Sequence, residues 1–175
     1  MRVDSGMRAS KNVYASGDVT GPPLLAHKAF AQALVAAENA SGFKSEFDPR
    51  AIPSVVYTDP ELVSVGLTES EARSAGYKVS TVKLPIGGVA RAVIEDSLDG
   101  FIKVVYEEGS KAILGVHIAA PHASELAGEA ALAIEMGATL EDLALTIHPH
   151  PTISEVMQEV AELALGRPKH FKVGR

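Results

Sequence analysis

The chain has 175 residues, of which 46% are hydrophobic, and its 16 basic and 22 acidic residues give a net charge of −6. This composition can form a buried core, which excludes intrinsic disorder, and an acidic chain without clustered Lys and Arg is not expected to bind nucleic acid. The sequence has no apolar run near the roughly 18 residues of a membrane span and no charged-then-apolar leader, so we expect no membrane partner and a cytoplasmic location. It contains no cysteine, which excludes a disulfide framework, a thiolate metal site and a thiol nucleophile.

The first 45 residues predict a strand, a loop and a helix. The run NVYASGD (residues 12–18) is β-branched and aromatic and ends in a Gly-Asp turn, after which two prolines interrupt the chain. From Leu24 onward, apolar residues recur at helical spacing as far as Gly42, a residue typical of helix ends. A single strand cannot form a sheet, so this segment looks like part of something larger. The polar, proline-containing stretch 42–53 predicts a linker.

Strands dominate the middle of the chain. β-branched and aromatic runs separated by turn signals predict strands at 54–57, 62–67, 78–84, 90–94, 101–106 and 113–118. The TESE pattern at 68–71 is a capping box, which predicts a short helix that ends at Gly76. Turn signals at 99–100 (DG) and 108–110 (EGS) join the last three runs, so we expect those runs to form an antiparallel meander.

Helices follow the strands. Ser124 is the expected N-cap of a helix that ends at Gly137, a capping box at 139–142 opens a short helix, and a last helix follows Thr152. Strands in the middle and helices at the end predict an α+β fold, with an antiparallel sheet and helices packed on one of its faces.

The densest polar cluster, TIHPHPTISE (residues 146–155), lies between the last two predicted helices. Its prolines push the preceding residues out of the helical region, which places His148 and His150 on extended backbone. We expect Glu155 in the first turn of the next helix, where its carboxylate can accept a hydrogen bond from one imidazole nitrogen and so set the tautomer. The spacing therefore allows a His–Glu pair suited to general acid–base chemistry.

Three other interpretations of this cluster are open. Thr152 and Glu155 also fit a capping box, in which Glu155 only accepts a hydrogen bond from the Thr152 amide. His148 and His150 can instead bind a metal with Glu155 as third ligand, although no further His or Asp stands nearby in the sequence. The histidines can also be ordinary hydrogen-bonded polar residues. Composition does not decide among these.

A second polar cluster, Gly17 and Asp18, leads toward the helix that starts near Leu24. An Asp at a strand end, beside the N–H groups of a helix terminus, suits the sugar hydroxyls and phosphates of a cofactor. A plain Gly-Asp turn explains the same residues. The chain has no G-x-G-x-x-G phosphate-binding fingerprint, and His27 is most simply a polar residue in the first turn of the helix.

Several runs together resemble one family, the dihydrolipoamide dehydrogenases and related flavin-dependent disulfide oxidoreductases. NVYASGDVTGPPLLAHKAFAQ is similar to the end of the family's FAD-binding part, and YTDPELVSVGLTESEA to the start of its C-terminal dimerisation domain. ILGVHIAAPHASELAGEAALAIEMGATLEDLALTIHPHPTISE resembles the rest of that domain, and GRPKHF its terminal tail. The resemblance runs from Val3 to about Val173. The PHASEL run favours lipoamide dehydrogenase over mercuric reductase, whose paired C-terminal cysteines are absent.

The resemblance implies specific roles for the two polar clusters. His150 would be the acid–base catalyst and Glu155 its partner, acting on the dithiol of the other subunit's active site by removing a thiol proton and, as imidazolium, stabilising a thiolate. His148 matches a less decisive position. For FAD, Asp18 would bind the ribityl or pyrophosphate part, and the backbone near the flavin ring is matched by Leu25, Ala26 and His27.

The resemblance also implies a division of the chain. Residues 1–45 would be the C-terminal remnant of an FAD-binding domain and residues 46–175 the dimerisation domain. The cofactors of the parent reaction would be FAD and NAD, yet the redox disulfide, the FAD fingerprint and the NAD domain of the family are missing from this sequence. We therefore expect the chain alone to be inactive and to bind neither cofactor. Without the rest of the FAD domain, residues 1–45 should dock on a neighbour, swap between chains or fray.

The expected partners follow from the same resemblance. They are a second copy of the chain, in a homodimer through the C-terminal domain, and possible further partners are a separate chain with the FAD and NAD domains and lipoyl-bearing proteins. An alanine-rich helix face allows close helix approach at the dimer interface, and it contains Ala130, Ala131 and Ala133. The alternatives are a stand-alone dimerisation or interaction module without redox activity, and a fragment of a mercuric-reductase-like relative.

Overall fold

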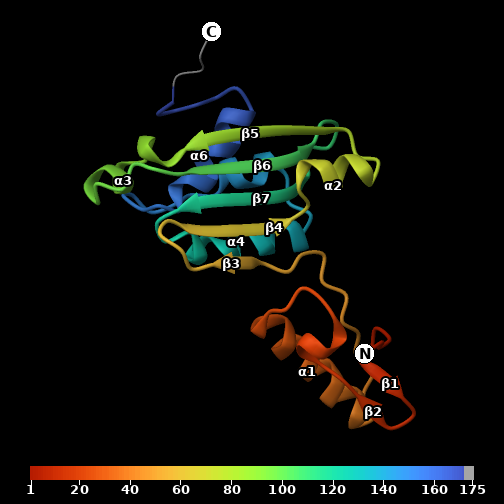
Figure 1. The fold of residues 1–175 in the computed structure, drawn as a ribbon. Coiled ribbons are helices and arrows are strands. Elements are labelled where there is room, and N and C mark those ends of the chain that lie inside the picture. The colour runs from red at the N-terminus through yellow and green to blue at the C-terminus, as the bar shows by residue number, and fades with distance from the viewer. Residues whose placement is uncertain (172–175) are drawn as a thin grey trace. The chain divides into compact units, whose positions relative to one another are not determined.

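The computed structural model describes residues 1–171, which form two compact units, one up to Pro49 and one from Arg50 onward (Figure 1). The end of the family resemblance at Val173 lies outside the described residues. No helix among the described residues is both long enough and apolar enough to cross a lipid bilayer.

The first unit is built on a hairpin and one long helix. Its elements are β1 (Arg8–Ser10), β2 (Val13–Tyr14), the 3₁₀ helix η1 (Gly17–Thr20) and α1 (Ala26–Ala40). The strand predicted at 12–18 is therefore mostly wrong, because only its start pairs with β1 and its end coils into η1. The expectation of a lone strand is also wrong, since the polar first ten residues supply β1.

The chain beyond α1 folds back onto the first unit. The Asn39 side-chain amide donates to Gly6 O at 3.1 Å and to Ser45 O at 2.8 Å, and Phe47 N donates to Ser5 O at 2.8 Å. These bonds explain why the first unit extends to Pro49, since residues 43–47 bond to its start.

The second unit contains a five-stranded antiparallel sheet in the order β3-β4-β7-β6-β5. Its strands are β3 (Ser54–Val56), β4 (Glu61–Gly66), β5 (Val79–Pro85), β6 (Phe101–Glu107) and β7 (Ile113–Ala120). Its helices are α2 (Glu69–Ser74), η2 (Ile86–Gly88), α3 (Ala90–Ile94), α4 (Ala123–Glu135), α5 (Leu140–Leu145) and α6 (Glu155–Ala164). The predicted α+β fold is confirmed.

One face of the sheet carries the core. Figure 1 shows α4 and α6 behind the sheet, and α5 packs on α6. In this core α6 packs on β5 and β6, and α4 packs on β4 and β7. Inward side chains of β6 and β7 and the apolar face of α6 belong to one core and are almost fully buried: Ile102, Val104, Val116, Ile118, Val156, Met157 and Val160. Burial of such a side chain contributes about 1.5–3 kcal/mol, which fixes α6, and with it the start of this helix, on the sheet.

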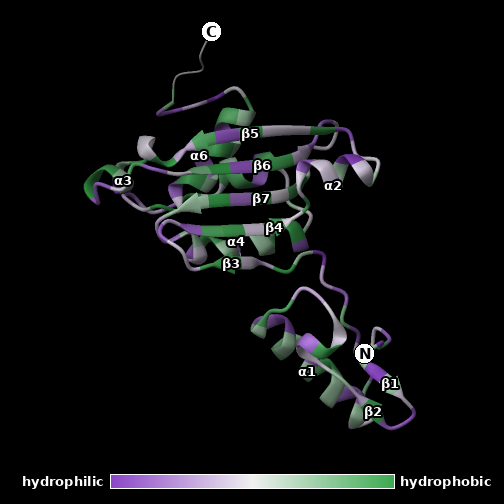
Figure 2. Ribbon diagram, viewed as in Figure 1, coloured by the Kyte–Doolittle hydropathy of each residue, from purple (hydrophilic) through white to green (hydrophobic). Residues whose placement is uncertain are grey.

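A polar band crosses the opposite face of the sheet. Lys83, Lys103 and His117 are cross-strand partners on β5, β6 and β7, and Figure 2 shows the aligned hydrophilic bands that they form. At one end of this face α2 buries Ala72 against Val79 and Val105, which makes a second, small core.

Three local expectations are corrected by the structure. Residues 90–94 form α3 and not a strand, because β5 pairs directly with β6 and the intervening segment is a connection outside the sheet. Ser124 is not the N-cap of α4: the helix starts after His122, and the Ser124 amide donates to Glu61 Oε2 at 2.8 Å. The alanine face is part of the chain's own core, since Ala130 and Ala133 are buried against the sheet and Ala131 packs beside them.

Candidate functional site

Glu155 is the centre of the predicted acid–base cluster. It is the first residue of α6, and it follows a loop in which the peptide bond between His150 and Pro151 is cis. Its Oε1 is 2.9 Å from Nδ1 of His150, and its Oε2 accepts a hydrogen bond from the Thr152 amide at 2.9 Å. One carboxylate thus bonds both the imidazole of His150 and the backbone of the loop before α6. The contact expected for an acid–base pair and the contact expected for a capping box are both present, each on a different oxygen of Glu155.

The Thr152 hydroxyl has a different partner from the helix amide that a capping box requires. The Thr152 hydroxyl donates to Pro149 O at 2.7 Å, and α6 begins after Ser154, two residues later than the sequence pattern indicates.

The histidine of this pair is exposed and its partner is partly buried. The His150 side chain is 65% exposed and that of Glu155 is 15% exposed. A carboxylate only accepts hydrogen bonds at neutral pH, so Nδ1 of His150 is the donor in this contact. The neutral ring then carries its lone pair on Nε2, which makes Nε2 the nitrogen that can take up a proton.

Glu155 stays charged although it is largely buried. Burial acts to raise the pKa of Glu155, but the hydrogen bonds from the Thr152 amide and His150, with the charges of His150 and His170, outweigh it, and the pKa is lowered. The carboxylate therefore remains a hydrogen-bond acceptor at neutral pH.

His148 belongs to a different pair. Its Nε2 is 2.9 Å from Oε1 of Glu129 on α4, and its Nδ1 is 3.0 Å from Thr146 O. The hydrogen bond with Glu129 is the main cause that raises the pKa of His148, against the effect of burial. Both nitrogens face acceptors, so the protonated ring is the form that satisfies both contacts.

A metal site formed by the two histidines finds no support. His148 and His150 bond different carboxylates, and residues 1–171 contain no group of three His, Asp or Glu side chains placed to hold a metal ion.

Sequence reasoning missed a neighbour of the acid–base pair. His150 and Glu155 line a small cavity of about 120 Å³ together with Glu159 and His170. The available signal was the spacing of Glu155 and Glu159, which are four residues apart and so lie on one face of α6. His170 follows α6 in the chain, and the pattern of residues gave no indication that it returns to this cavity.

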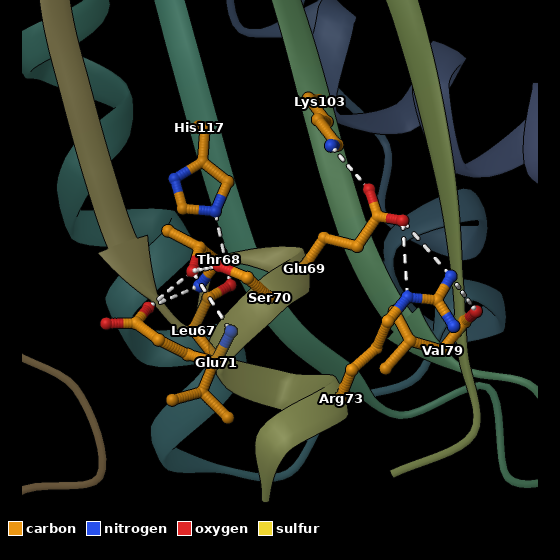
Figure 3. A network of polar contacts seen from close by, with 9 residues as sticks. All are labelled: Leu67, Thr68, Glu69, Ser70, Glu71, Arg73, Val79, Lys103 and His117. Atoms are coloured by element: carbon orange, nitrogen blue, oxygen red, sulfur yellow. Dashed lines mark hydrogen bonds and ion pairs between the residues drawn. The ribbon is translucent and has the colours of Figure 1, made fainter.

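A further histidine, His117, takes part in a network on the outer face of the sheet (Figure 3). Its Nε2 is 3.2 Å from Leu67 O and its Nδ1 is 2.9 Å from the Ser64 hydroxyl, and burial lowers the pKa of His117. Beside it, Glu69 bonds both Lys103 and Arg73. The network joins α2 to the sheet and explains the polar character of this face without a catalytic role.

The residues predicted to bind a cofactor lie in the first unit. Asp18 is exposed in η1, Leu25 is the N-cap of α1, and Ala26 and His27 are its first two residues. Gln32 on α1 accepts hydrogen bonds from the backbone and side chain of η1, which holds η1 on the helix.

The backbone of η1 comes close to α1. A Cβ at Gly17, whose φ is +80°, would lie 3.2 Å from Ala29 Cβ, so the glycine permits this approach. The structure thus puts Asp18 on a short helix that packs against α1, the helix whose first residues are the other candidates.

The chain has extensive similarity to known proteins. It is 53% identical over 163 residues to the dihydrolipoyl dehydrogenase of Thermus scotoductus, covering 93% of this chain and 35% of that protein. It is 47% identical over 169 residues to dihydrolipoyl dehydrogenase 2 of Haloarcula marismortui, covering 97% and 36%. The crystal structure of LpdA from Mycobacterium tuberculosis superposes with a TM-score of 0.84 at 31% identity, covering 93% and 36%.

These matches cover nearly all of this chain but only part of each relative. The chain spans about a third of the length of the curated relatives it matches. Residues 52–161 match the family model of the pyridine nucleotide-disulphide oxidoreductase dimerisation domain. With its fold and its matched sequence in agreement, the chain belongs to the pyridine nucleotide-disulphide oxidoreductase family and contains that family's dimerisation domain.

Proposed function

We propose that this chain supplies the His150–Glu155 acid–base pair and the dimer contact of a flavin-dependent disulfide oxidoreductase of the dihydrolipoyl dehydrogenase type. The observation that carries the proposal is the 2.9 Å contact between Nδ1 of His150 and Oε1 of the partly buried Glu155, with the imidazole ring itself exposed. The matched relatives named dihydrolipoyl dehydrogenase support the substrate class.

The chemistry of the pair follows from its geometry. Nε2 of His150 accepts the proton of a dihydrolipoamide thiol while that sulfur attacks a disulfide, so that one S–S bond breaks and a mixed disulfide forms. The resulting imidazolium stabilises the thiolate that leaves, and Glu155 balances its charge through Nδ1. These 175 residues include no cysteine, so the disulfide must belong to another polypeptide or to a segment outside this sequence.

We further propose that the first unit contributes to an FAD site. The exposed Asp18 can accept hydrogen bonds from sugar hydroxyls, and the start of the 15-residue α1 offers backbone N–H groups and the positive end of a helix dipole. Bound FAD would carry electrons from the dithiol to NAD. Leu25, Ala26 and His27 would face the flavin through their backbone.

The dimer contact is proposed at an exposed apolar surface beside residues 146–154, the loop that contains His150. The large apolar side chains of this surface are exposed: Leu132, Met136, Leu145 and Ile147. Of these, Leu132 and Met136 line a cavity of about 510 Å³ whose lining also includes His148 and Pro149, the residues just before His150. A second copy seated here would bring its own residues close to His150, as a histidine acting across a subunit boundary requires.

The test is a graft into the Thermus scotoductus relative, in which this chain replaces the matching 163-residue segment. We expect the grafted protein to reduce NAD with dihydrolipoamide. His150→Gln in the graft should lower turnover by about 100-fold or more, the usual contribution of a general acid–base group. His122→Gln, which also replaces an exposed histidine next to a carboxylate, is the matched control and should leave turnover near the unmutated level.

Turnover retained by the His150→Gln graft would refute the assigned role. The isolated chain with added FAD, NAD and dihydrolipoamide should show no turnover, because it has no cysteine to cycle between thiol and disulfide.

A further inference from the structure

Two carboxylates on successive turns of α6 each bind an imidazole. Glu155 bonds His150, and Oε1 of Glu159 bonds Nδ1 of His170. All four side chains line the same small cavity of about 120 Å³. The remaining lining residues, Gly88, Val89 and Ala90, have no titratable side chain. The acid–base pair therefore shares its surroundings with a second, similar pair.

Glu159 is a buried carboxyl group that bonds His170. Its side chain is 8% exposed, and within the described part of the chain its Oε2 is buried without a hydrogen-bond partner. An ionised carboxylate in such a place is costly unless a cation compensates it. The contact with Glu159 holds the His170 imidazole at the cavity that Glu155 also lines.

The segment that carries His170 is fixed on both sides. Lys169 Nζ lies 2.5 Å from Oε1 of the buried Glu162, and the Phe171 ring packs against the core. The ring occupies the space where a side chain at position 88 would be, since a Cβ on Gly88 would lie 2.2 Å from it. His170 is thus placed by its neighbours in the sequence.

We propose that His170 is a positioning residue of the acid–base site: held by Glu159 and anchored through Phe171, its imidazole lies at the cavity that Glu155 lines, where its protonated form stabilises the ionised Glu155 carboxylate that bonds His150. The positive charge of His170 is among the causes that lower the pKa of Glu155. The inference rests on the proposed function, because only there does Glu155 serve as the partner of an acid–base histidine.

The experiment is a titration of the Glu155 carboxyl group by ¹³C NMR in the full 175-residue chain. We expect His170→Gln to raise the pKa of Glu155, because a neighbouring positive charge is lost. The matched control is His122→Gln, which makes the same substitution at an exposed histidine beside Glu95 and outside this cavity, and it should leave the pKa of Glu155 near its unmutated value. His170 is 62% exposed, so its replacement is expected to preserve the fold, which amide spectra would check.

A second variant separates the placement of His170 from its charge. Phe171→Ala keeps the imidazole but removes its anchor, and it should also raise the pKa of Glu155. An unchanged pKa of Glu155 in His170→Gln would overturn the proposal, and an unchanged value in Phe171→Ala would overturn the anchoring role of Phe171. Both results are independent of turnover, whereas a His150→Gln graft that stays active would refute the proposed function and leave these titrations standing.

Discussion

At the scale of single residues, the site depends on how Glu155 divides its two oxygens. The sequence placed His150, Thr152 and Glu155 close together and offered two interpretations of the same carboxylate. The structure contains both hydrogen bonds, with one oxygen on the imidazole of His150 and one on the Thr152 amide. A pattern of residue types cannot decide such a question, because it does not say which atoms a side chain reaches.

The partners of His148 and His170 could not be predicted from the sequence, because they lie far away along the chain. Glu129 is 19 residues before His148, and His170 is 11 residues after Glu159. These contacts depend on how α4 and the segment after α6 pack, which no local spacing encodes. The predicted pair was found because both of its members lie within one loop and the following helical turn.

The His148–Glu129 pair predicts a pH dependence of stability. The pKa of His148 is raised in the folded state, so the stabilisation is fully present below the ordinary value of 6.5 and is lost as pH rises through the folded-state pKa. We therefore expect the urea midpoint of the chain to fall as pH rises above 6.5. In Glu129→Gln this fall should be smaller, and the urea midpoint near pH 6 should be lower than that of the unmutated chain.

Glu125→Gln is the control for this prediction, since it removes an exposed carboxylate one helical turn earlier on α4. It should keep the unmutated pH profile. Identical pH profiles for the unmutated chain and Glu129→Gln would show that the pair does not titrate as described.

At the scale of elements, sequence signals worked where a local motif sets the structure. The capping boxes at Thr68 and Thr139 both form, and they start α2 and α5. The prediction failed at 90–94, where β-branched residues indicated a strand. Such residues favour a sheet only when a neighbouring strand is available, and β6 is already paired with β5 and β7.

Close contacts of backbone with backbone also shape the elements. Where the chain leaves β4, Leu67 passes over β7 so closely that a Cβ on Gly115 would lie 2.0 Å from Leu67 O. On Gly66, whose φ is +74°, a Cβ would lie 2.4 Å from Leu114 O. Glycines at both positions allow α2 to turn onto the outer face of the sheet.

Gly115→Ala should therefore destabilise the second unit by about 1–3 kcal/mol, the usual cost of overpacking a well-packed site. Gly109→Ala is the matched control, because within the described chain a Cβ there meets no atom within 4 Å, and its effect should stay within about 0.5 kcal/mol. Urea unfolding measures both. Equal stability of the two variants would contradict the close approach at Gly115.

At the scale of the whole molecule, the chain combines a complete sheet domain with a smaller unit. The α+β architecture was predictable because runs of strands followed by runs of helices restrict the packing to a few arrangements. The family could be recognised from long motifs that cover most of the chain, and residues 52–161 match the family's dimerisation domain. The hairpin of β1 and β2 was not predictable, since its first strand has a polar sequence without alternation.

In the proposed function, His150 acts on sulfur that belongs to another subunit. The most direct test mixes two inactive grafts: one with His150→Gln, and one with serines in place of the redox cysteines that the family resemblance places upstream. Random pairing puts half of the dimers in mixed form, each with one intact site of two, so turnover should recover to about a quarter of the unmutated level. A mixture that stays as inactive as its parents, although mixed dimers are shown to form, would contradict the claim.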